Sequence, residues 1–282
     1  MKQESEKWTS IYTSKNKIFD FQFREIWRYR DLVKMFVVRD FKTMYKQTIL
    51  GPLWVIIVPI ITTLMQVFVF GNIAGLSTDG TPQFLFYLAG NAIWLYFSGC
   101  LTSTADSFVS NSAIFGKVYF PRLITPIAIV ISQGISFLVQ FGIFLLFDLY
   151  YCSQGMAEIN SVALLTPALF CLLAALSLGC GIIIASVTTK YRDLRVLFTF
   201  GVQLWQYASA IVFPVSIVPT NLYPIVMANP VVPIVEAFRY GFTGHGAFSI
   251  PYLCLSAVTT LAILAVGVCL FNRVEKTFMD TI

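Results

Sequence analysis

Long uncharged stretches are the feature of this chain that most constrains its fold. A helix needs about 20 predominantly apolar residues to cross a hydrocarbon core about 30 Å thick. Six stretches meet this requirement, at 53–74, 84–105, 124–147, 162–187, 196–218 and 252–271. Only 12% of the 282 residues are charged, about half the fraction that is usual in a soluble domain. We therefore predict an all-α membrane protein with six transmembrane helices over 53–282, after an N-terminal segment at 1–52.

The fifth stretch continues into an uncharged region of unusual length. Residues 196–235 carry no charge, and as one straight helix they would be about 60 Å long, about twice the hydrocarbon thickness. Prolines interrupt this region repeatedly, and proline breaks or kinks a helix. We interpret it as a span followed by short re-entrant or interfacial helices in a gate region at 219–242. Irregular backbone at membrane depth needs shelter by protein or a water-filled cavity, which favours a translocation path over a plain anchor.

The positive charges lie almost entirely on one predicted side of the membrane. Of the 19 Lys and Arg residues, 11 precede the first stretch. Seven more lie in the loops at 106–123 and 188–195 and in the C-terminal tail, whereas the alternate loops contain only Arg239. By the positive-inside rule, both termini and these two loops are cytoplasmic. We therefore predict a multi-pass protein of the cytoplasmic (inner) membrane, with residues 1–52 on its cytoplasmic side.

The segment before the first span combines basic and apolar residues at close to helical spacing. Between residues 23 and 46, side chains such as Phe36, Val37 and Phe41 recur among Arg and Lys residues. A basic amphipathic helix lies in the membrane interface, with its cations toward anionic head groups. We therefore expect an N-terminal amphipathic interface helix over 25–47 that contacts membrane lipids. An anchor that only fixes orientation is the simpler interpretation.

The sequence lacks the motifs of several common enzyme classes and the ligand clusters of metal sites. It contains no GxxxxGK[ST], GxSxG or HExxH motif, so we expect no P-loop and no catalytic residue of these classes. The cysteines form no CxxC pair and the lone His245 has no second ligand nearby, so we expect no metal site and no cofactor in this chain. The spans hold almost no ionisable groups, whereas ion-coupled carriers usually place carboxylates at mid-membrane. Energy for any driven transport must therefore come from outside this chain.

Aromatic residues are frequent in the predicted spans. Trp205 and Tyr207 lie beside Gln203, Gln206 and Ser209, and polar side chains in a span tend to face protein or water. Because aromatic faces stack on the apolar faces of sugars, we nominate Trp205 and Tyr207 as pathway residues. An ordinary lipid-facing or interfacial aromatic residue is the alternative for each.

Five segments, in order along about residues 25–275, resemble the polysaccharide-export permeases of the type-2 ABC exporters. They are YRDLVKMFVVRDFKTMYKQTILGPLWVIIVPI (29–60), TDGTPQFLFYLAG (78–90), NSAIFGKVYFPR (111–122), KYRDLR (190–195) and NPVVPIVEAFRYGF (229–242). The resemblance implies export of a lipid-linked polysaccharide such as O-antigen across the cytoplasmic membrane. It also implies a homodimer of this chain with two copies of a separate ATPase subunit, which would bind the ATP and magnesium. No nucleic-acid partner is expected.

The resemblance also implies three sets of functional residues. In the loop at 106–123, an ATPase-coupling helix would use Ala113, Ile114, Phe115, Lys117, Tyr119 and Phe120, the alternative being an ordinary basic loop. In the gate region, Glu236 and Arg239 have the spacing of an ion pair on one helix face, the alternative being a simple pair that caps an exposed helix. At the cytoplasmic mouth, Arg39, Lys42 and Lys46 would meet the pyrophosphate of a polyprenyl carrier, although they could equally snorkel to ordinary head groups.

Other function classes remain open from the sequence. A type-2 ABC permease for a small lipid or a drug is the nearest alternative. A membrane-embedded glycan-lipid transferase or polymerase predicts clustered carboxylates or Arg in the extracytoplasmic loops, but those loops contain only Asp79, Glu158, Glu236 and Arg239, which are scattered. A structural membrane adaptor does not explain the proline-broken fifth region.

Overall fold

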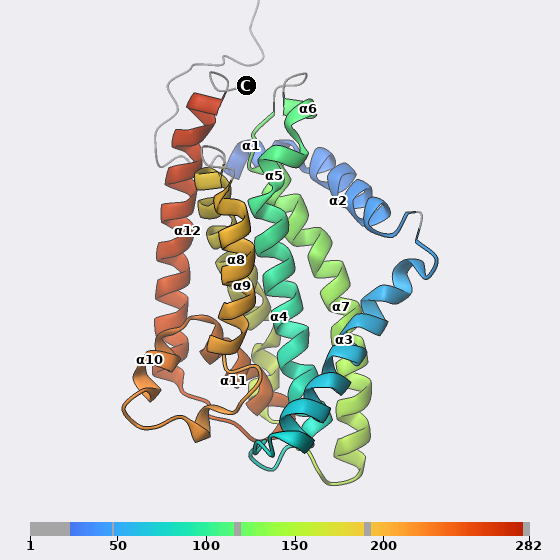
Figure 1. Cartoon of the computed structure of the whole chain (residues 1–282). Coiled ribbons are helices and arrows are strands. Elements are labelled where there is room, and N and C mark those ends of the chain that lie inside the picture. Colours follow the sequence, from blue (N-terminus) through green and yellow to red (C-terminus); the bar gives the residue numbers. More distant parts are fainter. Residues whose placement is uncertain (1–22, 47, 116–119, 189–192, 279–282) are drawn as a thin grey trace, which may run out of the picture.

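The computed structural model describes residues 23–46, 48–115, 120–188 and 193–278, which are helical and contain no β-strand (Figure 1). Five helical runs within these ranges are long and apolar enough to cross a membrane: Gly51–Ile73, Gln83–Ala105, Ile124–Ser153, Ser161–Thr188 and Ile250–Arg273. They correspond to the first four predicted spans and to the sixth. The prediction of an all-α fold with several membrane-spanning helices is therefore confirmed.

The fifth predicted stretch does not form a continuous helix over 196–218. Helix α9 (Leu194–Ala208) has 15 residues, which is about 22 Å at 1.5 Å per residue and too short to cross the hydrocarbon core alone. The backbone leaves the helix at Ser209, and Ala210 adopts a positive φ of 53°. The side chains that hold this break belong to residues later in the chain, as shown below. The described residues therefore contain five complete candidate spans and not the six predicted.

A bundle of long helices forms the body of the molecule (Figure 1). Its members are α3 (Trp54–Gln66), α4 (Gln83–Ala105), α7 (Ile124–Ser153), α8 (Thr166–Thr188) and α12 (Ile250–Phe278). Helix α4 is central, because it packs against α3, α7 and α8 and is the most buried of the five candidate spans. Helix α3 lies at the edge of the bundle, between the short helix η1 (Gly51–Leu53) and the π-helix η2 (Val67–Ile73).

Two glycines allow α8 and α12 to pack closely. A Cβ atom on Gly179 would lie 2.9 Å from the backbone of Leu264, and one on Gly267 would lie 2.8 Å from the carbonyl oxygen of Gly179. Small residues at such contacts are typical of membrane helices, where van der Waals packing replaces the hydrophobic driving force.

The two ends of the bundle carry different short helices (Figure 1). At one end lie α1 (Phe23–Arg28), α2 (Arg30–Tyr45), α5 (Ser107–Ser110) and α6 (Ser112–Phe115). Helix α2 runs obliquely to the bundle and packs against α7. At the other end lie α10 (Tyr223–Ala228) and α11 (Val231–Thr243), and α11 packs on η3 (Ser161–Leu165) and α4. Residues 219–242, where the sequence predicts a gate region, thus include the two short helices α10 and α11 at one end of the bundle.

Candidate functional site

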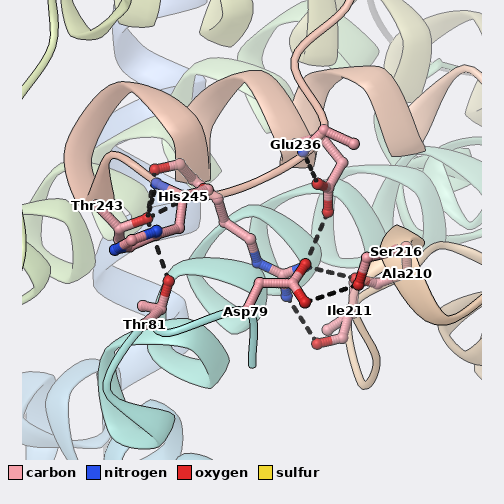
Figure 2. Close-up of polar contacts among 10 residues, drawn as sticks. Asp79, Thr81, Ala210, Ile211, Ser216, Glu236, Thr243 and His245 are labelled. Carbon is pink, nitrogen blue, oxygen red and sulfur yellow. Dashed lines mark hydrogen bonds and ion pairs between the residues drawn. The ribbon is translucent and has the colours of Figure 1, made fainter. Parts of the chain in front are cut away.

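A buried ion pair lies on α11, and its polar contacts are drawn in Figure 2. Arg239 and Glu236, both on α11, are joined by a 3.2 Å contact between Nη1 and Oε1, and each side chain is only 2% exposed. The ion pair predicted from the spacing of these two residues is therefore confirmed. The alternative of a pair on an exposed helix is wrong, because α11 is buried along almost its whole length. The role of the pair in gating stays a prediction.

Arg239 also holds the end of α9. Its Nη1 atom donates to the carbonyl oxygen of Ala210 at 2.7 Å and its Nη2 atom to that of Ile211 at 2.8 Å. These carbonyls follow the helix end, and satisfying them lets the break remain buried. On its other side, the guanidinium lies 3.6 Å from the ring centroid of Phe86 on α4. One side chain therefore connects α11, α4 and the chain that leaves α9.

Two further residues define this site. A Cβ atom on Gly90 of α4 would lie 2.7 Å from Arg239 Nη2, so that only glycine leaves room for the guanidinium. The second oxygen of Glu236, Oε2, accepts a hydrogen bond from the backbone N–H of Ala247 at 2.9 Å. Each charge is thus paired with several partners, which is the condition under which ionic groups remain buried.

A loop between α3 and α4 adds polar contacts to the same end (Figure 2). Asp79 accepts a hydrogen bond from the hydroxyl of Ser216 at 2.7 Å. Thr81 and Thr243 are joined through their hydroxyls at 3.5 Å, and Thr243 also donates to the carbonyl of His245 at 3.2 Å. The loop is thereby attached both to the segment after α9 and to the end of α11.

Asn229 caps the end of α9 from a position about 20 residues later. Its Nδ2 atom donates to the carbonyl of Ala208 at 3.0 Å and its Oδ1 atom accepts from the indole N–H of Trp205 at 3.2 Å. Trp205 also packs edge-on against Phe97 of α4, with ring centroids 5.2 Å apart. Tyr207, in contrast, is 56% exposed on α9. The structure therefore does not bring the two nominated pathway residues together.

At the opposite end of the molecule, five phenylalanines form what we call the aromatic cluster: Phe36 of α2, Phe108 of α5, Phe115 of α6, Phe120, and Phe271 of α12. Ring centroids are 5.6 Å apart for Phe36 and Phe120, 5.6 Å for Phe115 and Phe120, and 4.8 Å for Phe108 and Phe271. The cluster connects the loop at 106–123 with α2 and α12.

The residues nominated for ATPase coupling divide into three groups. Phe115 and Phe120 are buried in the aromatic cluster and present no docking surface. Ala113 is exposed and Ile114 half-buried on α6. Lys117 and Tyr119 lie outside the described residues. Of the described members of this set, only Ala113 and Ile114 are thus at the surface.

The three basic residues nominated for the carrier head group also divide. Arg39 turns toward the bundle, where Nε contacts Asp40 at 2.8 Å, Nη2 contacts Asn111 at 3.0 Å, and the guanidinium lies 4.5 Å from the Phe36 ring centroid. Lys42 and Lys46 are exposed. Near Arg39, Asp106 at the end of α4 pairs with Arg195 at the start of α9.

Several residues at these sites were not nominated from the sequence, namely Phe86, Asn229, Phe36, Asn111 and the backbone carbonyls of Ala210 and Ile211. One signal was available for the buried ion pair. A lone Arg and a lone Glu in an otherwise uncharged segment must find partners when they are buried. The carbonyl partners have no such signal, because every residue carries one.

The molecule is a multi-pass membrane protein, because its long apolar helices are of the length that crosses a membrane and pack around buried polar contacts. Residues 31–243 match the family described as ABC-2 type transporter, and the chain belongs to this family. It is 25% identical over 250 residues to the "O-antigen export system permease protein RfbA" of Klebsiella pneumoniae, covering 89% of this chain and 94% of that protein.

Two other relatives are similar over the same extent. A protein of the same name from Myxococcus xanthus is 23% identical over 256 residues, which cover 90% of this chain and 96% of the relative. The "Polysialic acid transport protein KpsM" of Escherichia coli is 25% identical over 255 residues, which cover 88% of this chain and 95% of the relative. The resemblance that the sequence segments indicated is therefore confirmed at the level of the family.

Proposed function

We propose that this chain is the transmembrane subunit of an ATP-driven exporter that carries a lipid-linked polysaccharide across the cytoplasmic membrane. The observation that carries the proposal is the similarity over nearly the whole of both chains to permeases named for O-antigen export and polysialic acid transport. The chain would act as two copies with two separate ABC ATPase subunits, which bind the ATP and magnesium. The sequence supports this division of labour, because it contains no P-loop.

We propose that the end with α1, α2, α5 and α6 faces the cytoplasm, as the positive-inside rule indicates. Helix α9 would then enter from the cytoplasmic side, and residues 209–222 would complete the fifth crossing without regular helix. Such backbone requires shelter. Arg239 supplies it through hydrogen bonds to the carbonyls of Ala210 and Ile211, and Asn229 binds the carbonyl of Ala208 at the end of α9. Helices α10 and α11 would form the extracytoplasmic gate, and α2 would lie in the cytoplasmic interface.

The proposed coupling runs through the aromatic cluster. An ATPase that docks on the surface around Ala113 would move α6, and Phe115 and Phe120 would transmit the movement to Phe36 of α2. Phe108, which stacks on Phe271, would transmit it to α12. Closely packed interiors transmit displacement because they have few voids. Lys117 and Tyr119 remain predicted contacts of the same surface.

At the gate, Glu236 and Arg239 would act as a latch on the backbone after α9. In the described state Arg239 holds the carbonyls of Ala210 and Ile211. A movement of α9 or α4 that separates these groups would release the segment at 209–217, which lies beside Trp205 and Tyr207. The exposed face of α9, including Tyr207, would then line the polymer path between two copies of the chain.

At the cytoplasmic mouth, the exposed Lys42 and Lys46 of the α2 end would attract the pyrophosphate of a polyprenyl carrier, together with Arg39. Lys and Arg are suited to phosphate because they supply charge-assisted hydrogen bonds. The structure supports an unequal contribution, since the Arg39 guanidinium already contacts Asp40 and Asn111.

Genetic complementation tests the proposed function. In cells that lack this chain, surface polysaccharide should disappear and lipid-linked polymer should accumulate in the cytoplasm. Re-expression should restore export only when the cognate ATPase subunit is present and can hydrolyse ATP. Normal polymer export without this chain, coupled with loss of transport of a small lipid or a drug, would instead identify it as a permease of that other type.

A further inference from the structure

We propose that a groove between α2, α3 and α7 binds one phospholipid with a zwitterionic, amine-bearing head group of the phosphatidylethanolamine class. The lipid would come from the leaflet at the α1–α2 end of the bundle. This inference goes beyond the proposed export function and does not depend on it, because it concerns a bilayer lipid and not the transported molecule.

Two separate cavities along one face of α7 make up the proposed groove. The first, of about 550 Å³, lies between α2, the ends of α4 and α5, and α7, and most of its lining side chains are polar, including Arg39, Asp106, Asn111 and Ser132. The second, of about 330 Å³, lies between α2, η1, α3 and α7, and its lining is almost wholly apolar, with Phe41 among its residues. A polar chamber beside an apolar one matches the two parts of a lipid.

One face of α7 runs through both cavities. Ile129, Ser132 and Gln133 line the polar cavity, and Ser136 and Val139 line the apolar cavity. These positions follow the spacing of a single helix face. From Ile129 to Val139 the helix rises about 15 Å, which is half of a hydrocarbon core about 30 Å thick. The groove therefore extends over about one leaflet, as a phospholipid does.

The charges in the polar cavity select the head group. Its ionisable lining residues are Arg39, Asp40 and Asp106, of which Arg39 pairs with Asp40, and Asp106 pairs with Arg195 from outside the lining. These pairs leave no unbalanced cation among the described lining residues, so an acidic phospholipid would add negative charge beside the two carboxylates without compensation. A zwitterionic head group can place its phosphate near Arg39 and its ammonium group near Asp106 and Asp40.

An unpaired hydroxyl in the groove also indicates a ligand. Ser132 lines the polar cavity and is 3% exposed, yet its Oγ atom has no hydrogen-bond partner among the described residues. Buried hydroxyl groups are nearly always hydrogen-bonded, and an orphan costs free energy. A phosphate or ester oxygen of a lipid in the groove would accept the hydrogen bond that Ser132 lacks.

Native mass spectrometry of the purified full-length chain tests the proposal. The protein is delipidated in detergent and then incubated with phosphatidylethanolamine, phosphatidylglycerol or a polyprenyl phosphate, each in a separate sample. We expect one phosphatidylethanolamine to be retained, in preference to the other two. Arg39→Gln removes the phosphate partner and Val139→Trp fills the apolar cavity, so each should weaken retention about tenfold or more.

Matched variants separate the loss of lipid binding in the groove from the effects of removing a charge or adding bulk outside the groove. Lys34→Gln removes a positive charge from an exposed position of the same helix α2, and Leu138→Trp places the same bulk on a 63% exposed position beside Val139. Both should retain the lipid as the unmodified chain does, and all four variants should elute as the unmodified chain in size-exclusion chromatography. Equal retention by all variants, or preferred binding of phosphatidylglycerol or the polyprenyl phosphate, would overturn the proposal.

Discussion

Arg239 of α11 donates a 2.7 Å hydrogen bond to the carbonyl oxygen of Ala210, 29 residues earlier in the chain. The contact joins a buried, ion-paired side chain to the point where α9 ends. Because the carbonyls after a helix end need partners when they are buried, Arg239 is part of the reason why the fifth apolar stretch can stop within the protein. Arg239 therefore contributes both to the stability of the fold and to the position at which α9 ends.

Replacing this arginine should destabilise the whole chain. Arg239→Met leaves Glu236 buried without its cation, and removing one partner of a buried pair costs about 3–5 kcal/mol. The unfolding free energy, measured by denaturant titration in detergent, should fall by that amount. The matched control is Arg195→Met, which breaks an exposed pair with Asp106 and should change it by about 1 kcal/mol or less.

A second substitution, at the ion-pair partner Glu236, checks the cause of this loss. Glu236→Gln removes the unpaired charge that Arg239→Met leaves behind, so the double variant should be less destabilised than the sum of the two single variants. Additive losses would show that the two side chains act independently of one another.

The apolar patterns of the sequence were sufficient for the five long helices, because length and hydropathy depend on local composition alone. The end of α9 was not predictable in the same way. It depends on Asn229 and Arg239, whose side chains reach back across 20 to 30 residues. The i, i+3 spacing of Glu236 and Arg239 predicted their ion pair, but its burial follows from the packing of α11 against η3 and α4.

The other candidate sites were also only partly predictable from the sequence. Phe115 and Phe120 read as an apolar docking face in the sequence, yet Phe36 and Phe271 from distant helices cover that face. Helical geometry alone argued against pairing Trp205 with Tyr207, because residues two apart on a helix do not face the same side. Their different environments in the structure agree with that geometry.

The surface and the interior of the coupling region should respond differently to substitution. Ala113→Trp adds bulk at an exposed position, so it should reduce co-purification of the ATPase subunit about tenfold or more without lowering the stability of the chain. Phe115→Ala removes a buried ring and should lower the unfolding free energy by about 3–5 kcal/mol. Normal complex formation and export by Ala113→Trp would exclude docking at this surface.

The membrane orientation can be tested by labelling single cysteines in a background without the native ones. Asn221→Cys lies in the exposed segment before α10, and Lys42→Cys lies on the exposed side of α2. A membrane-impermeant maleimide should label Asn221→Cys in intact spheroplasts and Lys42→Cys only after permeabilisation. Labelling of both from the same side would contradict the orientation derived from the positive charges.

Trp205 and Tyr207 of α9 should differ in what they support, the one protein stability and the other transport. Trp205→Phe keeps a ring against Phe97 but loses the indole hydrogen bond to Asn229, so it should lower the unfolding free energy by about 1 kcal/mol. Tyr207→Ala removes an exposed side chain and should leave stability within about 0.5 kcal/mol. If Tyr207 lines the polymer path, export should nevertheless slow, whereas unchanged export would identify it as lipid-facing.

If Lys42 and Lys46 lie at the proposed cytoplasmic mouth, their loss should affect the capture of the proposed carrier more than the stability of the protein. Each Lys near an anionic surface contributes about 1 kcal/mol of attraction, so Lys42→Gln with Lys46→Gln should weaken the apparent affinity for the lipid-linked substrate about tenfold or more. The effect should diminish as salt is raised, because exposed charges are screened. Lys34→Gln is the control, since it removes the same charge from the same helix farther from the first span. An equal loss for Lys34→Gln would mean that total positive charge, and not the position of these lysines, attracts the carrier.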